Sequence, residues 1–139
     1  MRYHSSASRR IRRILIVEDH EDVRTELGEH FRDMGYQVET AADGNDGIAR
    51  ALRMNPDVIV LDLALPRLNG WDMIGLLRTY PSTKEIPLVT YSDREREDDA
   101  DRALAARCDV VLDAPCTPEE IEEAVEGLLG LENPESEVG

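Results

Sequence analysis

Short apolar runs alternate along this chain with segments of helical periodicity, and this alternation restricts the fold more than any other feature of the sequence. Strands are expected at residues 14–17, 36–40, 57–63, 86–91 and 110–112, and helices at residues 23–34, 46–54, 71–80, 94–107 and 117–129. Strictly alternating strands and helices predict a parallel sheet that is covered by helices on both faces. The predicted fold class is therefore α/β, a doubly wound five-stranded parallel sheet with five helices.

The start of the last expected helix has the clearest local signal. Thr117 is a typical N-cap residue, Pro118 suits the first helical position, and Glu120 completes a capping box. The 139 residues of the chain fit one domain. We expect that domain at residues 13–131, between a basic N-terminal tail at residues 1–12 and an acidic C-terminal tail at residues 132–139.

Composition excludes several classes of partner. The formal net charge of −14 argues against direct DNA binding, because a duplex requires a basic protein surface that displaces its counterions. No stretch approaches the roughly 20 apolar residues of a membrane span, and a cytoplasmic location is expected.

Cys108 and Cys116 flank the last expected strand, which would hold the two thiols too far apart for a disulfide.

Acidic and hydroxyl residues stand at the carboxyl ends of the expected strands. Glu18 and Asp19 follow the first strand, and Asp62 ends the third. Ser92 and Asp93 end the fourth. Ligands of doubly wound sheets bind beyond these strand ends, and carboxylates that meet there repel one another unless a cation such as Mg²⁺ lies among them. A carboxylate beside Mg²⁺ and a hydroxyl group can attack a phosphoryl group and form an aspartyl phosphate.

Other ligand sites of doubly wound sheets are not indicated. The first strand is not followed by G-x-G-x-x-G, the dinucleotide fingerprint, and the chain contains no G-x-x-x-x-G-K-[ST] nucleotide loop. A flavodoxin would need a phosphate loop rich in Ser, Thr and Gly after that strand, whereas the acidic segment at residues 18–22 would repel a phosphate in the absence of a metal. His20, inside this segment, is expected to be a solvent-exposed loop residue.

Three groups of residues resemble the receiver domains of two-component response regulators. The first is the strand with its acidic pair at residues 14–19, and the second is the D-x-x-L-P-x-L-N-G block at residues 62–70. The third is Ile86-Pro87, which leads to Ser92. The resemblance extends from about residue 13 to about residue 129, and it implies a flavodoxin-like receiver fold with strand order 2-1-3-4-5.

The resemblance also assigns roles to individual residues. Asp62 aligns with the phosphoacceptor, and Ser92 aligns with the hydroxyl that bonds the phosphoryl group and moves during switching. Asp19 and Asp62 are expected to bind Mg²⁺ (or Mn²⁺) directly and Glu18 through water. The backbone carbonyl of Ala64 is expected to complete the protein's share of the metal shell.

Three positions depart from the pattern of the family. Ala114 stands where the family usually has a lysine, Val111 where it usually has an aromatic residue, and Asp93 where it usually has a small residue. Lys84, the only lysine in the chain, precedes the fourth strand and cannot reach the pocket. Because the family's Lys-Pro bond is usually cis, the bond between Ala114 and Pro115 is expected to be cis as well.

Two functions remain open. The first is a single-domain receiver that takes a phosphoryl group on Asp62 from a histidine kinase or phosphotransfer protein and signals through protein–protein contacts. Its only catalysis would be Mg-dependent phosphorylation and dephosphorylation of itself. The alternative is a pseudo-receiver, a phosphorylation-independent interaction module. With no output domain expected, the signal would pass to a downstream partner, which would bind from Arg94 to Arg107 and from Thr117 to Leu129.

Overall fold

The computed structural model describes residues 11–65, 68–92 and 107–130, and five strands within them form one parallel sheet in the order β2-β1-β3-β4-β5. The strands are β1 (Arg13–Val17), β2 (Gln37–Ala41), β3 (Val58–Asp62), β4 (Leu88–Ser92) and β5 (Val110–Asp113). The helices are α2 (Glu21–Asp33), α3 (Gly44–Met54), α4 (Gly70–Leu77) and α6 (Pro118–Leu129). The predicted fold class and strand order are confirmed. The fifth expected helix, at residues 94–107, lies outside the described residues apart from Arg107.

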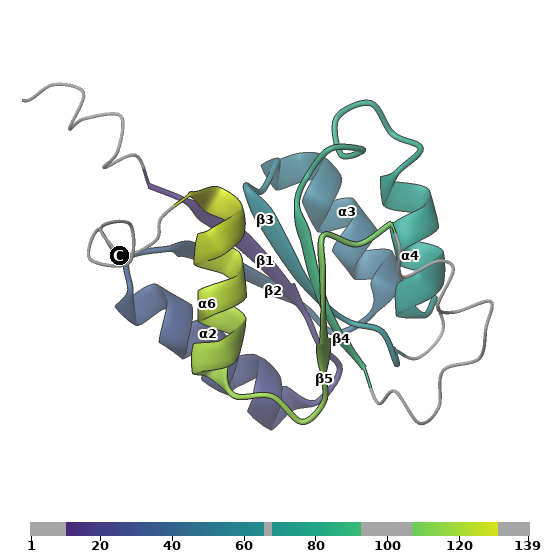
Figure 1. The fold of residues 1–139 in the computed structure, drawn as a ribbon. Helices are drawn as coiled ribbons and strands as arrows, with labels where there is room; N and C mark the ends of the chain where they lie inside the picture. Colours follow the sequence, from purple (N-terminus) through teal and green to yellow (C-terminus); the bar gives the residue numbers. More distant parts are fainter. Residues whose placement is uncertain (1–10, 66–67, 93–106, 131–139) are drawn as a thin grey trace, which may run out of the picture.

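Helices α2 and α6 cover one face of the sheet, and α3 and α4 cover the other (Figure 1). Successive side chains of a strand point to opposite faces, so a continuous apolar run suits a strand that is buried on both. Accordingly, Ile14 and Ile16 of β1 pack against α2 and α6, whereas Leu15 and Val17 pack against α3 and α4. All four side chains are fully buried. The central strand β3 repeats this alternation, which places Asp62 on the same face as Val58 and Val60.

The local signals at the start of α6 are confirmed. The Thr117 hydroxyl accepts a hydrogen bond from the Glu120 backbone N–H at 3.1 Å, and the Glu120 carboxylate accepts one from the Thr117 N–H at 2.8 Å.

The bond between Ala114 and Pro115 is cis, as expected. Cys108 and Cys116 are both free thiols. No helix in the described ranges is long and apolar enough to cross a bilayer.

Helix α4 ends at Leu77, three residues before the expected end at Tyr80. The Arg78 guanidinium donates to the carbonyl oxygens of Lys84 at 2.8 Å and Ile86 at 2.9 Å, which folds the chain back toward β4. These contacts join residues six and eight positions apart, a spacing that the helical periodicity used to predict the longer helix does not describe. The helix expected at residues 23–34 is α2 (Glu21–Asp33); Leu27 and Phe31 are buried, whereas Val23 and Met34 are exposed.

The first turn of α4 lies directly against the end of β3. The Gly70 N–H donates to the Leu63 carbonyl oxygen at 3.1 Å. A Cβ atom at Gly70 would lie 2.5 Å from the Leu63 Cα atom and 2.9 Å from the Asp62 carbonyl oxygen. Since both neighbours are backbone atoms, neither can rotate away. The absence of a side chain at Gly70 therefore allows the close approach that holds the backbone of Asp62.

We predict opposite effects for two glycine substitutions in α4. Gly70→Ala should lower the free energy of unfolding by about 1–3 kcal/mol, because its methyl group overlaps the end of β3. Gly75→Ala, the matched control, should raise it by up to about 1 kcal/mol, since no atom lies within 4 Å of its added Cβ and alanine favours a helix. Urea unfolding followed by circular dichroism measures both, and equal effects would contradict the packing described for Gly70.

Candidate metal centre at the carboxyl edge of the sheet

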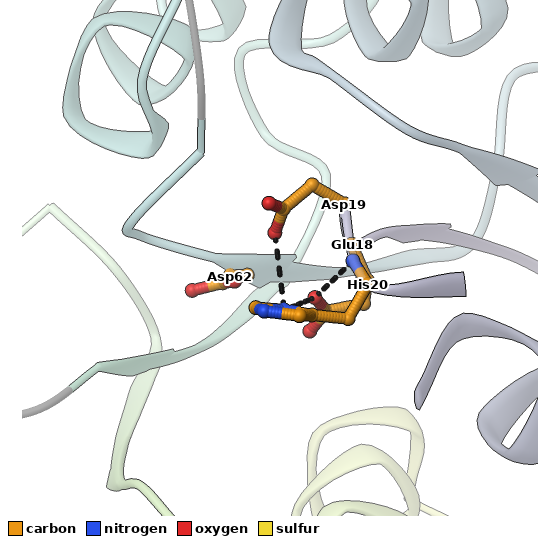
Figure 2. A group of neighbouring side chains, drawn as sticks. All are labelled: Glu18, Asp19, His20 and Asp62. Atoms are coloured by element: carbon orange, nitrogen blue, oxygen red, sulfur yellow. Dashed lines mark hydrogen bonds and ion pairs between the residues drawn. The ribbon is translucent and has the colours of Figure 1, made fainter. Parts of the chain in front are cut away.

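Four side chains converge where β1 and β3 end. They come from Glu18, Asp19, His20 and Asp62, and one ligand atom from each lies within 4.8 Å of the other three (Figure 2). Strands β1 and β3 pair in parallel with Val17 opposite Leu61, so the residues that follow each strand emerge side by side. The structure therefore brings together the three carboxylates that the strand pattern singled out. It adds an imidazole that was not expected to belong to the site.

Glu18 is buried, with 2% of its surface exposed, and both of its carboxylate oxygens accept hydrogen bonds. Oε2 accepts from the His20 backbone N–H at 2.9 Å and lies 3.0 Å from His20 Nδ1. Oε1 accepts from the Tyr91 hydroxyl. Burial, followed by the charge of Glu18, raises the pKa of Tyr91, so the phenol stays protonated and remains a donor. Glu18 is thus held in one orientation by its neighbours.

Tyr91 is a member of the site that sequence reasoning missed. It lies opposite Asp62 in the register of β3 and β4, and it shares the α2 and α6 face of the sheet. A partial signal was present in the sequence, because Tyr91 has a hydroxyl group and stands immediately before Ser92 at the end of the strand. Its partner Glu18 is 73 positions away along the chain, so no local pattern indicated the contact.

His20 is exposed, as expected, but it also belongs to the cluster. Its side chain is 73% exposed, while Nδ1 lies 3.4 Å from Asp19 Oδ1 and 3.0 Å from Glu18 Oε2. The hydrogen bond with Glu18 and then the charge of Asp19 raise the pKa of His20. A protonated imidazole at this position partly offsets the negative charge at the mouth of the site.

Asp62 is buried, and its carboxylate accepts fewer hydrogen bonds than that of Glu18. Its side chain is 8% exposed, and its Oδ1 accepts a hydrogen bond from the Ala64 N–H at 2.9 Å. Burial, together with the charges of Glu18 and Asp19, raises the pKa of Asp62 to about 6, against the opposing effect of the Ala64 N–H. A neighbouring cation would reverse this shift, because it favours the ionised carboxylate.

The donor set fits a hard divalent cation. Oδ1 of Asp19 is buried and accepts no hydrogen bond from the described residues. Carboxylate and carbonyl oxygens are the ligands that Mg²⁺ prefers, and the ion usually takes one or two carboxylates from a protein. Asp19 and Asp62 can supply these, with Glu18 nearby and Ala64 in the loop that follows β3. The site residues predicted from the sequence are therefore compatible with Mg²⁺.

The remaining predicted residues lie beside this cluster or outside the described ranges. Ser92 ends β4 and is 7% exposed, and its carbonyl oxygen accepts a hydrogen bond from the Ala114 N–H at 2.9 Å. Asp62, Ser92 and Ala114 line one cavity of about 290 Å³. Val111 is half-buried in β5, where it lies opposite Thr90. Asp93, the third departure from the family pattern, lies outside the described residues.

Comparison with known proteins identifies the family. Residues 14–126 match the response regulator receiver domain. The chain therefore belongs to the response regulator receiver domain family.

Several relatives and solved structures resemble this chain. It is 43% identical over 98 residues to protein-glutamate methylesterase/protein-glutamine glutaminase 6 of Anaeromyxobacter dehalogenans, a match that covers 69% of this chain and 27% of that protein. It is 34% identical over 117 residues to the transcriptional regulatory protein PrrA of Mycobacterium tuberculosis, which covers 84% of this chain and 49% of PrrA. The chain thus spans half or less of these relatives.

Among solved structures, the receiver domain of the sensor histidine kinase PA1611 from Pseudomonas aeruginosa has a TM-score of 0.77 and 26% identity, and covers 86% of this chain and 98% of its own. That structure has a magnesium ion coordinated in its active site cleft. The chemotaxis response regulator CheY4 of Vibrio cholerae has a TM-score of 0.75 and 26% identity, over 84% of this chain and 98% of its own. These likenesses support the fold described above.

The buried charge of Asp62 predicts a stability change in metal-free protein. The folded-state pKa of about 6 exceeds the ordinary value of 3.8, so the folded protein binds more protons than the unfolded chain between these values. The contribution of Asp62 to the free energy of unfolding therefore falls as the pH rises from about 4 to about 6. Asp62→Asn should raise the free energy of unfolding by about 1–3 kcal/mol at pH 7 and have little effect near pH 4.

Urea unfolding in EDTA at both pH values measures this difference. Glu123→Gln, which removes a carboxylate from the exposed face of α6, is the matched control and should change stability little at either pH. If Asp62→Asn lowers the free energy of unfolding at pH 7, the buried charge of Asp62 does not destabilise the metal-free protein.

Proposed function

We propose that this receiver domain accepts a phosphoryl group on Asp62 in the presence of Mg²⁺ (or Mn²⁺) and passes the signal on through protein–protein contacts. The observation that carries the proposal is the placement of one buried carboxylate, Asp62, between two further carboxylates and a cavity that Ser92 also lines. Membership of the receiver family and the magnesium ion in the PA1611 receiver support the same function.

Asp62 is the proposed nucleophile. The Ala64 N–H occupies Oδ1, so Oδ2 is the oxygen available to attack phosphorus. A new bond forms between Oδ2 and phosphorus as the bond to the donor's leaving group breaks, and the leaving group takes the electron pair. Asp62 must be ionised for this step, and its raised pKa of about 6 makes the metal-free carboxylate partly protonated in mildly acidic solution.

The surrounding residues have distinct proposed tasks. Asp19 and Asp62 would hold Mg²⁺ directly, Glu18 would act through water, and the Ala64 carbonyl would complete the protein ligands. The ion would neutralise the crowded carboxylates and the phosphoryl oxygens. Ser92 would donate its hydroxyl to a phosphoryl oxygen. Tyr91 fixes Glu18, and therefore limits which oxygen of Glu18 faces the site.

Histidine kinases or phosphotransfer proteins are the proposed phosphoryl donors. The similar receiver domain of PA1611 belongs to a sensor histidine kinase, which supports a kinase as the donor. We propose that the downstream partner binds an acidic surface on α6 of this domain. Glu119 and Glu123 are exposed there, whereas Glu122 lies 2.7 Å from His30 Nε2 of α2 and is partly engaged. The other proposed segment, at residues 94–106, lies outside the described residues.

Phosphorylation by a small donor tests the function. Incubation with acetyl phosphate and Mg²⁺ should add the mass of one phosphoryl group, and EDTA should abolish the addition. Asp62→Asn should remain unlabelled, because it lacks the nucleophile, while Asp33→Asn at the end of α2 should be labelled as fully as the natural protein. Mass spectrometry of the intact protein and its peptides measures the outcome.

A natural protein that stays unlabelled, although folded and able to bind Mg²⁺, would refute phosphotransfer. That result would favour the alternative function of a phosphorylation-independent interaction module. The comparisons do not support this alternative.

Charge at position 114 should control the rate of phosphorylation. Ala114 lines the same cavity as Asp62, so Ala114→Lys should place an ammonium beside the phosphoryl oxygens, whose negative charge develops in the transition state. We predict an increase of about tenfold or more in labelling rate, equivalent to about 1.4 kcal/mol. Combination with Asp93→Ala should increase it further. Ala114→Met, which fills similar space without charge, is the control, and an equal rate for Lys and Met would contradict the electrostatic explanation.

A further inference from the structure

A cavity of about 290 Å³ lies between α2, α6 and the carboxyl ends of β3, β4 and β5. Its walls are mostly apolar. Val23 and Leu27 line it from α2, Ile121 lines it from α6, and Ala114 and Cys116 line it from the segment that follows β5. The volume exceeds the space that one water molecule needs, and apolar walls offer water few hydrogen bonds. These walls suit the hydrocarbon part of a small ligand.

Carboxylates line one side of the same cavity. They belong to Glu18, Asp62 and Glu26, and His20 is the only basic residue among the described residues that line it. Glu18 already accepts hydrogen bonds from Tyr91 and His20. Asp62, nine-tenths buried, accepts a hydrogen bond only at Oδ1 from the described residues, which leaves Oδ2 without a donor. A ligand that enters this cavity thus meets a carboxylate oxygen that accepts no hydrogen bond from the described residues, next to apolar walls.

We propose that this cavity binds a small alkylammonium ion, with its ammonium group donating to Oδ2 of Asp62 and its hydrocarbon chain packed between Leu27 and Ile121. An ammonium is a compact charge with three donors, and a four-carbon stem like that of lysine matches the mixed lining. Burial of each methylene strengthens binding, while the charge pairs with the carboxylate.

The cavity overlaps the metal cluster at Asp62, Glu18 and His20 and extends beyond it between α2 and α6. Asp19, whose Oδ1 accepts no hydrogen bond from the described residues, belongs to the metal cluster but does not line the cavity. A hydrated metal ion would gain nothing from contact with Leu27 and Ile121, whereas an alkyl chain would. The alkylammonium site requires only the folded domain, so it goes beyond the proposed phosphorylation.

Titration with n-butylammonium chloride, followed by NMR, tests the proposal on the full chain in EDTA. We expect saturable shifts in the methyl signals of Leu27, Ala114 and Ile121. Two matched probes separate charge from shape, because n-butanol has the chain without the charge and butyrate has the opposite charge. Both should bind at least tenfold more weakly. Shifts of equal size and saturation for n-butanol, or no saturable shifts with n-butylammonium, would overturn the proposal.

Two variants locate the binding. Ala114→Leu should weaken binding at least tenfold because its larger side chain takes up part of the cavity, whereas Ala49→Leu, exposed on α3 at the opposite face of the sheet, should bind like the natural protein. Asp62→Asn should weaken binding at least tenfold, and it serves as the second variant in case Ala114→Leu does not fold. Unchanged affinity in Asp62→Asn would refute the site. Because unphosphorylated protein is used, a failure here is separate from a failure of acetyl phosphate labelling.

Discussion

The burial of two carboxylates at the ends of neighbouring strands is the constraint on which the rest of the site depends. Removal of a carboxylate from water costs several kcal/mol unless hydrogen bonds or a cation replace the lost hydration. The parallel pairing of β1 with β3 leaves no alternative position for Glu18 and Asp62, because both strands are buried on both faces and end at the same edge. The surrounding residues therefore determine how each charge is accommodated.

The structure accommodates the two carboxylates differently. Glu18 accepts hydrogen bonds from the Tyr91 hydroxyl and the His20 N–H, and Arg24 donates to its backbone carbonyl oxygen at 2.9 Å. Asp62 receives one backbone N–H, and burial raises its pKa. Two neighbouring acids in unlike surroundings can perform unlike tasks, as a positioned structural group and as a reactive one. Here the less compensated carboxylate is also the one that ends the central strand.

Sequence reasoning succeeded where a feature depends on short-range pattern and on the rules of parallel sheets. The continuous apolar runs of β1 and β3 and the capping box at Thr117 are local, and both gave correct elements. The convergence of Glu18, Asp19 and Asp62 followed from the shared edge of the strands.

Features that depend on distant contacts were not predicted. The contact between Tyr91 and Glu18 requires the register of β4 against β3 and the direction of each side chain. The early end of α4 depends on carbonyl oxygens that Arg78 reaches several residues later. His20 was expected to face solvent, and its imidazole does so while also contacting Glu18. The spacing of apolar and polar residues along the sequence contains no information about such contacts.

The close approach of Gly70 to the end of β3 connects the two sides of the sheet mechanically. Asp62 lies on the same face as Val58 and Val60, which pack against α2 and α6. Helix α4 covers the opposite face (Figure 1). Between Gly70 and the backbone of Asp62 and Leu63 there is no side chain that can absorb a displacement by changing its rotamer. A shift of the strand end toward Gly70 therefore meets the backbone of α4 directly, with no side chain between them to change its rotamer.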